Sequence, residues 1–186
     1  MKEIESLYLH IPFCKQICSY CDFCKMFYNE KFVDEYLNEL ENEISNRYKN
    51  EYLKTIYIGG GTPSSLSQKQ LEKLFNIIKK LNIKEKYEFS FECNISDINK
   101  ELLELLKNNK VNRISIGIET INEKFYKLLN RYNNKEEVIN KIKLVKEYFD
   151  NINIDLMYAF PNETMEDLDN DLNFFKELDV PHISIY

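Results

Sequence analysis

The sequence predicts an α/β fold, namely a partial (β/α)6 barrel that resembles part of a TIM barrel and is open on one side. Strand-like and helix-like segments alternate along the 186 residues, and repeated βα units with right-handed crossovers build a parallel sheet with helices outside it. A doubly wound open sheet would show the same alternation. The barrel is favoured because unusual residues fall at the carboxyl ends of the expected strands, where barrel enzymes build their sites. These residues are His10, Gly59, Gly60, Gly61, Glu92, Glu119, Asp155 and Tyr186.

The first half of the chain is expected to contain three strands and two helices. Ser6 to His10 predicts the first strand, and a long loop follows it. Apolar residues recur at helical spacing from Glu30 to Arg47, which predicts a helix. Thr55 to Ile58 predicts the second strand, which ends in three glycines. Ser67-x-x-Gln70 forms a capping box that predicts a helix to about Leu81, and Tyr87 to Glu92 predicts the third strand.

The second half continues this alternation. Its expected strands are Asn112 to Ile118, Asn153 to Met157 and His182 to Tyr186. Four helices are expected between and around these strands. The first is capped by Ser96 or Asp97 and runs to about Lys107, and a short second one is opened by Thr120-x-x-Glu123. The third runs from Lys135 to Phe149, and the fourth is capped by Asn162 or Thr164 and runs to about Leu178.

The loop after the first strand carries three cysteines, Cys14, Cys18 and Cys21, with the spacing C-x3-C-x2-C. Three thiolates this close in the chain can hold three corners of a cuboidal iron–sulfur cluster. The fourth iron is then open to bind and reduce a small molecule, which a cluster with four cysteine ligands does not easily do. This spacing therefore predicts redox chemistry.

Two other uses of these cysteines are less compatible with the spacing. A structural zinc site usually takes its ligands from two well-separated pairs, whereas here Cys18, Cys21 and Cys24 overlap in one run and no second pair follows. A disulfide framework is expected in secreted chains, and no signal peptide precedes this loop. Cys24 is expected to be an additional thiol near the cluster, and Cys93 to be buried and inert.

Composition limits the classes of partner. The chain is long enough for one domain, and we expect residues 1–186 to form one. The formal net charge of −6 argues against a nucleic-acid partner. No apolar run approaches the roughly 20 residues that span a bilayer, and the charged amino terminus lacks the apolar segment of a signal peptide. We therefore expect a cytoplasmic protein without a transmembrane segment.

The cysteine loop, with Tyr20 directly before its third cysteine, resembles the signature of the radical S-adenosylmethionine (SAM) superfamily. Further segments resemble one branch of it, the oxygen-independent coproporphyrinogen III oxidases and the HemW-type heme chaperones. They are Tyr8-x-His10-Ile-Pro-Phe-Cys14, Gly59-Gly60-Gly61-Thr62-Pro63-Ser64, Phe91-Glu92-Cys-Asn94, Arg113-Ile-Ser-Ile-Gly-Ile-Glu119, Asn130-Arg131, Ile154-Asp155-Leu-Met-Tyr-Ala-Phe-Pro161 and Pro181-His182-Ile-Ser-Ile-Tyr186.

The resemblance implies a 4Fe–4S cluster held by Cys14, Cys18 and Cys21, with SAM on the fourth iron. It implies SAM contacts from Tyr8, Tyr20, Gly60, Gly61, Thr62, Glu92, Glu119, Arg131 and Asp155, and assigns no catalytic residue. Arg131 would pair with the SAM carboxylate through its planar fork. Glu119 stands where the relatives usually have glutamine, so its carboxylate, when ionised, can only accept hydrogen bonds. Purely structural alternatives exist for these positions: a tight turn for the glycines, a core aromatic for Tyr8, a surface side chain for Arg131 and a hydrogen bond to a loop for Asp155. His10 and His182 are expected to be structural.

Two functions follow from the resemblance. The first is reductive cleavage of SAM to a 5′-deoxyadenosyl radical in porphyrin metabolism, with an electron donor such as flavodoxin or ferredoxin and a porphyrinogen substrate. The second is a heme-binding chaperone without oxidase activity, which Phe23 favours because the oxidases carry a further cysteine there. A truncated inactive form is the third alternative. Relatives continue with more barrel and a C-terminal domain, so we expect the cluster and SAM sites to be largely complete and the substrate site not.

Overall fold

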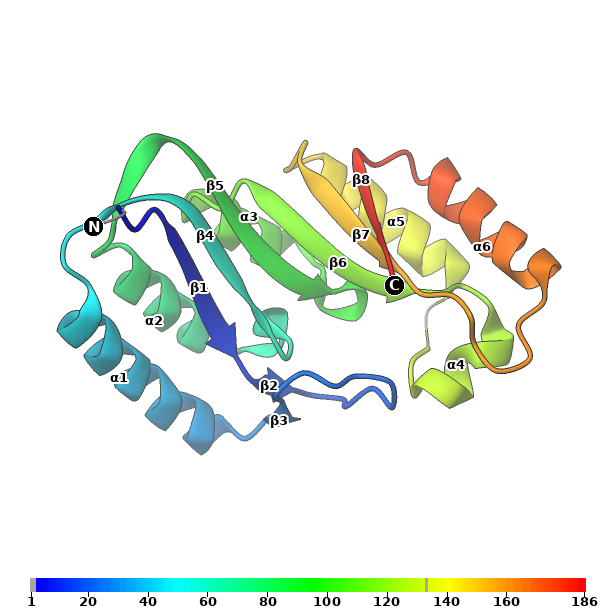
Figure 1. Ribbon diagram of the computed structural model, residues 1–186, viewed down its shortest axis with the longest axis horizontal. Helices are drawn as coiled ribbons and strands as arrows, with labels where there is room; N and C mark the ends of the chain where they lie inside the picture. The colour runs from blue at the N-terminus through cyan, green and yellow to red at the C-terminus, as the bar shows by residue number, and fades with distance from the viewer. Residues whose placement is uncertain (1–2, 133) are drawn as a thin grey trace.

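The computed structural model describes residues 3–132 and 134–186, and its centre is one parallel sheet of six strands (Figure 1). The sheet contains β1 (Ser6–Ile11), β4 (Tyr52–Gly60), β5 (Asn82–Asn94), β6 (Arg113–Glu119), β7 (Ile152–Leu156) and β8 (His182–Ile185), in that order. Every neighbouring pair is parallel. A doubly wound sheet reverses its strand order at a switch point. Here the order follows the chain without reversal, which confirms the predicted barrel-like arrangement.

Strands β1 and β8 are the two edges of the curved sheet. Because these edges do not pair with each other, the barrel is open, as expected. The helices are α1 (Glu30–Arg47), α2 (Gln68–Ile78), α3 (Lys100–Asn108), α4 (Glu123–Leu129), α5 (Lys135–Lys146) and α6 (Met165–Glu177), with short 3-10 turns η1 (Pro63–Ser65) and η2 (Ile95–Asp97). In the view of Figure 1, α3 and α5 lie behind the curved sheet and α4 lies beyond the carboxyl ends of its strands. Two-residue strands β2 (Phe13–Cys14) and β3 (Met26–Phe27) bracket the cysteine loop.

The two faces of the sheet differ in chemistry because strand side chains alternate between them. One set is apolar and packs in a single core with the helices. From the sheet it includes Leu9, Ile11, Ile56, Ile58, Phe89, Phe91, Ile114, Ile116, Ile152 and Ile154. The alternate positions carry polar or hydroxyl-bearing side chains, which therefore line the concave face. Among them are Tyr8, His10, Tyr57, Glu92, Ser115, Asn153, Asp155 and Ser184.

The sequence located the elements well, but two of its caps are wrong. The helix from Glu30 to Arg47 has its predicted bounds, and the capping boxes at Ser67 and Thr164 are present. The helix expected after Ser96 or Asp97 starts at Lys100, because those two residues belong to η2 and the side chain of Asn99 caps α3. Asn122, and not Thr120, caps α4. No helix in the described part of the chain is long and apolar enough to cross a membrane.

Candidate functional site

The cysteine loop leaves the sheet directly after β1 and returns to it through backbone hydrogen bonds. The amide of Met26 donates to the carbonyl of Pro12 at 2.7 Å, and the amide of Tyr28 donates to the carbonyl of Cys14 at 2.8 Å. The segment between them projects from the carboxyl end of the sheet, where β2, β3 and the loop lie between the first strands and α4 in Figure 1. The predicted cluster loop is therefore at the edge where the other predicted site residues end their strands.

The three predicted ligands differ in exposure from the fourth cysteine of the loop. Cys14 is buried, Cys18 and Cys21 are half-buried, and Cys24 is exposed. The hydroxyl of Thr62 donates to the Cys14 sulfur at 3.4 Å, and Arg131 Nη1 donates to the Cys18 sulfur at 3.9 Å. Burial raises the pKa of Cys14, which the Thr62 hydrogen bond partly opposes. Donors directed at sulfur stabilise a thiolate, the form that binds a metal.

The chemistry of these thiols fits an iron–sulfur cluster, because all three come from one loop and are buried or half-buried. Within residues 3–132 and 134–186, no three histidine, cysteine or acidic side chains form a group that could hold one ion. A mononuclear zinc site draws its sulfurs around one centre, whereas a cuboidal cluster takes one thiolate at each of three irons and needs them farther apart. The spacing C-x3-C-x2-C, and the donors directed at two of the three sulfurs, agree with the cluster.

The three glycines at the end of β4 are required by the packing of protein groups around them. A Cβ added to Gly59 would lie 2.7 Å from the Glu92 carboxyl carbon, and one on Gly61 would lie 2.7 Å from the Pro12 carbonyl carbon. Gly60 has φ of +120°, and its Cβ would lie 2.6 Å from the His10 ring. The turn thus brings β4 against β1, β5 and the start of the cysteine loop.

Glu92 lies beneath this turn and is held by two donors. The Tyr57 hydroxyl donates to its Oε1 at 2.7 Å, and the Gly60 amide donates to its Oε2 at 3.0 Å. Burial raises the pKa of Glu92 despite these hydrogen bonds. The carboxylate therefore faces the site and is paired, as expected for an acidic residue at the end of an apolar strand.

Tyr8 and His10 form a chain of contacts that reaches the cysteine loop. The rings of Tyr8 and Tyr57 stack at 5.9 Å, and the Tyr8 hydroxyl lies 3.0 Å from His10 Nδ1. His10 Nε2 lies 2.8 Å from the Cys24 carbonyl oxygen, which can only accept, so Nε2 carries a proton. In the neutral tautomer Nδ1 then accepts from Tyr8. Both ring nitrogens of His10 therefore have protein partners, which agrees with the expected structural role.

Arg131 is the most connected side chain of the site. Its Nη1 forms an ion pair with Glu119 Oε1 at 2.9 Å and donates to the Tyr20 hydroxyl at 3.1 Å. Its Nη2 donates to Asn94 Oδ1 at 3.1 Å and to the Gly117 carbonyl at 2.9 Å. Burial raises the pKa of Glu119 even beside this guanidinium, while the charge of Glu119 raises the pKa of Arg131 against the effect of burial. Arg131 thus joins β5, β6 and the cysteine loop.

Asp155 belongs to a polar group on the neighbouring strands. Asn153 donates to Asp155 Oδ1 at 2.9 Å and to the Ser115 hydroxyl at 2.8 Å, and the Ser184 hydroxyl donates to Asn153 Oδ1 at 2.9 Å. Burial raises the pKa of Asp155. All the predicted contacts therefore lie on the strand ends, on the glycine turn or beside the cysteine loop, but the structure gives each of the carboxylates a protein partner.

The carboxyl end of α4 contributes contacts that the sequence did not reveal. The Ser19 amide donates to the Leu129 carbonyl at 3.3 Å, and Gln16 donates to the Asn130 carbonyl. Asn130 has left-handed backbone angles and donates from its side chain to the Ile17 carbonyl at 3.0 Å. Asn130 after an amphipathic segment is a typical helix terminus, and that signal could have located the end of α4. Its long-range partners carry no local signal.

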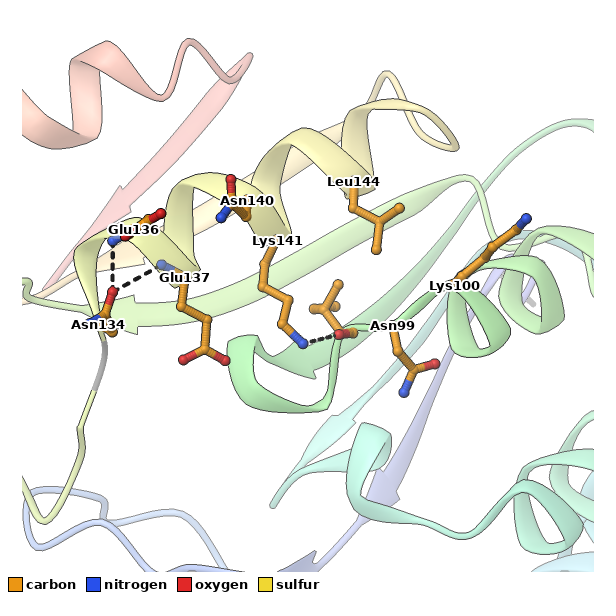
Figure 2. Close-up of a pocket in the computed structure, with 9 residues that line it drawn as sticks. Asn99, Lys100, Asn134, Glu136, Glu137, Asn140, Lys141 and Leu144 are labelled. Carbon is orange, nitrogen blue, oxygen red and sulfur yellow. Dashed lines mark hydrogen bonds between the residues drawn. The ribbon is translucent and has the colours of Figure 1, made fainter.

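The pocket drawn in Figure 2 lies elsewhere, between the start of α3 and α5. This groove of about 560 Å³ is lined by Asn99, Lys100, Asn134, Glu137 and Lys141 among others, and Lys141 donates to the Ile98 carbonyl. None of the cysteines or predicted SAM contacts lines it. The candidate site is therefore at the carboxyl ends of the strands and not in this groove.

Known proteins share this fold and these segments. Over 188 residues the chain is 41% identical to the heme chaperone HemW of Lactococcus lactis, covering 100% of this chain and 49% of that protein. It is 30% identical to the oxygen-independent coproporphyrinogen III oxidase of Escherichia coli, covering 97% of this chain and 41% of the oxidase. The solved structure of coproporphyrinogen III oxidase (HemN) from E. coli, described as a radical SAM enzyme, superposes with a TM-score of 0.91 at 29% identity, over 98% of this chain and 44% of HemN.

These relatives confirm the predicted family, and the chain spans about half the length of the curated relatives it matches. The fold agrees with them because nearly the whole chain superposes on the solved structure of HemN. The family model described as the radical SAM superfamily matches residues 8–175, which include the cysteine loop and the ends of β4, β5, β6 and β7. The chain therefore belongs to the radical SAM superfamily.

Proposed function

We propose that this chain binds a 4Fe–4S cluster through Cys14, Cys18 and Cys21 and binds SAM at the carboxyl ends of its strands. The observation that carries this proposal is the placement of the three thiols. They come from one loop, two of them receive donors from Thr62 and Arg131, and the loop lies against the glycine turn. When bound, the cluster and SAM would supply one-electron reductive cleavage to a 5′-deoxyadenosyl radical.

The chain's own residues suit a ligand that carries hydrogen-bond donors. Glu92 and Asp155 present carboxylates to the concave face, and the pKa of each is raised by burial. Glu119 Oε2 is buried and has no hydrogen-bond partner among the described residues. SAM offers an ammonium group and ribose hydroxyls, so the Glu92 and Asp155 carboxylates would bind and orient it.

Anaerobic reconstitution with iron and sulfide, followed by EPR of the reduced protein with and without SAM, tests this proposal. We expect a cluster signal that changes when SAM is added. Alanine at Cys14, Cys18 or Cys21 should abolish it, whereas alanine at the exposed Cys24 or the buried Cys93 should leave it in place. A cluster without a SAM response, or zinc in place of iron, would contradict the proposal.

Heme delivery is the second candidate function. It is favoured because identity to the HemW chaperone is 41%, against 30% to the oxidase, and because Phe23 occupies the position of the additional oxidase cysteine. Titration of the reduced protein with heme, followed by its visible absorption band, tests this function. Saturable binding near one heme per chain supports it. A linear response equal to that of heme titrated into buffer without the protein argues against it.

The two candidates have different partners. SAM cleavage requires an electron donor, for which a flavodoxin or ferredoxin is our proposal, and a porphyrinogen substrate. Heme delivery requires heme and an acceptor protein. The expected cytoplasmic location suits both and stays a prediction. Deoxyadenosine formation by the reconstituted chain, measured with and without a porphyrinogen, separates them, since only the oxidase-like function predicts that the porphyrinogen accelerates it.

A further inference from the structure

The guanidinium of Arg131 is already engaged by the protein. A guanidinium has five N–H donors, four of them on Nη1 and Nη2. Nη1 faces Glu119, Tyr20 and Cys18, and Nη2 donates to Asn94 and to the Gly117 carbonyl. Only Nε has no partner among the described residues. The end-on fork that would receive a ligand carboxylate is therefore occupied by protein acceptors.

The ion pair has a space built for it. A Cβ on Gly117 would lie 2.7 Å from Glu119 Oε1 and 3.3 Å from both Nη atoms of Arg131, so only glycine admits the pair at this position. Glu119 itself takes the left-handed backbone conformation, with φ of 65°, which a residue with a side chain rarely adopts. The Glu119 and Arg131 side chains are 9% and 12% exposed. The Glu119–Arg131 ion pair is thus buried and depends on the absence of a side chain at Gly117, unlike an ion pair on the surface.

Arg131 also reaches the cysteine loop at two points. Tyr20 lies between Cys18 and Cys21, and its hydroxyl receives Nη1 at 3.1 Å, while the Cys18 sulfur lies 3.9 Å from the same nitrogen. The other end of the guanidinium is anchored on β5 and β6. A rigid planar group that bridges the sheet and the loop fixes the position of the loop relative to the sheet.

We propose that Arg131 is a positioning residue for the cluster ligand Cys18, and that Glu119 holds it in this role in competition with the carboxylate of a bound ligand. This inference rests on the proposed function, since it takes Cys18 as a cluster ligand. It gives Glu119 a specific purpose. An uncharged glutamine at this position would leave the guanidinium charge unbalanced and its fork more readily available to a ligand.

The two charges should act on the cluster in opposite directions. Hydrogen bonds to sulfur and nearby charge set the reduction potential of an iron–sulfur cluster. A cationic donor at Cys18 stabilises the more negative reduced state, so Arg131→Gln should lower the potential. Glu119 opposes this effect, so Glu119→Gln should raise it. Because any two opposite charges near a cluster shift its potential in opposite directions, the size of the shifts relative to charge-matched controls carries the test.

The redox test uses the reconstituted chain without SAM, titrated anaerobically and followed by EPR. Charge-matched controls are Lys15→Gln and Asp22→Asn, which remove one charge next to Cys14 and Cys21 respectively but contact neither member of the pair. We expect the controls to shift the potential much less than Arg131→Gln and Glu119→Gln. Equal shifts in controls and pair variants, or shifts of the same sign for both pair variants, would overturn the proposal.

The competition is tested by SAM affinity, measured by calorimetry on the same proteins. Glu119→Gln should tighten SAM binding about tenfold, the scale of one charge-assisted hydrogen bond. An unchanged or weaker affinity would show that Glu119 does not compete. The double variant Glu119→Gln with Arg131→Gln removes both charges together and serves as the folding control, because it leaves no uncompensated buried charge.

A measurement on the cluster-free chain separates this inference from the proposed function. Amide hydrogen exchange over residues 15–21 should be faster in Arg131→Gln than in the parent chain or in Asp22→Asn, because the bridge between loop and sheet is lost. The same rate in all three would show that Arg131 does not hold the loop, whether or not the chain loads a cluster. Failure of reconstitution in the parent chain would count against the proposed function alone.

Discussion

Gly60 combines an unusual backbone angle with a close neighbour. Its φ is +120°, and an added Cβ would lie 2.6 Å from the His10 ring. Gly60→Ala should therefore destabilise the chain by about 2 kcal/mol or more, since strain at such an angle costs about 1–3 kcal/mol before the clash is counted. Urea denaturation of the cluster-free protein, with the midpoint and slope compared with those of the parent, measures this loss.

A second substitution separates the two causes. His10→Ala removes the ring that the new Cβ meets but leaves the backbone angle unchanged. The double variant should therefore lose less stability than the sum of the two single variants, because contacting sites are not additive. Gly60→Ala with the stability of the parent chain would show that neither strain nor the His10 contact matters at this turn.

Candidate residues of the site could be named from the sequence, but their pairing could not. Glu92 and Asp155 were expected at one edge because they end strands, whereas Cys14 and Arg131 were assigned to the site by the family resemblance. That Arg131 would meet Glu119 and the cysteine loop depends on side chains from separate elements converging on Gly117. No local pattern encodes such a meeting, so the sequence suggested only that Arg131 would pair with a ligand.

At the scale of elements, the carboxyl end of α4 anchors the cysteine loop through hydrogen bonds. Its last carbonyls accept from Ser19 and Gln16, and the Asn130 side chain donates to Ile17. We expect Asn130→Ala to cost about 1–2 kcal/mol, because alanine loses the hydrogen bond and tolerates the left-handed conformation poorly. Urea denaturation gives the cost, and amide exchange of the loop shows where it acts.

Asn130→Gly is the matched control, because glycine accepts the left-handed backbone but cannot make the side-chain bond to Ile17. We expect it to be more stable than Asn130→Ala and still to exchange its loop amides faster than the parent chain. Equal stability of the two variants would assign the whole effect to the hydrogen bond. Loop amides that exchange as slowly as in the parent chain in both variants would show that Asn130 does not anchor the loop.

The caps show why element boundaries were only partly predictable. Ser67 and Thr164 cap their helices as expected, because the box needs only residues three positions apart. Thr120 has the same local pattern, but its hydroxyl donates to the buried Asp171 of α6, and Asn122 caps α4 instead. A long-range partner therefore overrides a local capping signal that the sequence alone shows.

At the scale of the whole molecule, the open barrel exposes a polar concave face while burying several of its carboxylates. Burial raises the pKa of Glu92 and Asp155 on this face, and likewise of Asp171, which lies on α6 and not on a strand. A closed barrel would fill this space with apolar side chains. Here the polar face is suited to a charged ligand. Its carboxyl groups are removed from water, which favours their protonated form in the folded state and lowers the stability of the ionised chain.

This cost should appear as a pH dependence of stability. A carboxyl whose folded pKa is raised binds its proton more tightly in the folded than in the unfolded chain. Its stabilising contribution is therefore complete below about pH 4, where free carboxyls titrate. The contribution is lost as the pH rises through the raised pKa. The half-buried Asp167, whose pKa its Lys124 contact lowers, acts in the opposite sense at more acid pH. We expect the free energy of unfolding of the cluster-free chain to fall from pH 5 to pH 8.

Asp171→Asn provides the comparison that assigns the effect. Asp171 is fully buried and accepts from the Thr120 hydroxyl and the Ile121 amide, and the asparagine carbonyl can keep the backbone contact. Urea denaturation at each pH should show a smaller loss from pH 5 to pH 8 in this variant than in the parent, by about 1.4 kcal/mol for each unit by which burial raises the pKa. A parent stability that rises over this range, or parallel curves for the two proteins, would mean that the buried acids stay ionised and are compensated by their hydrogen bonds.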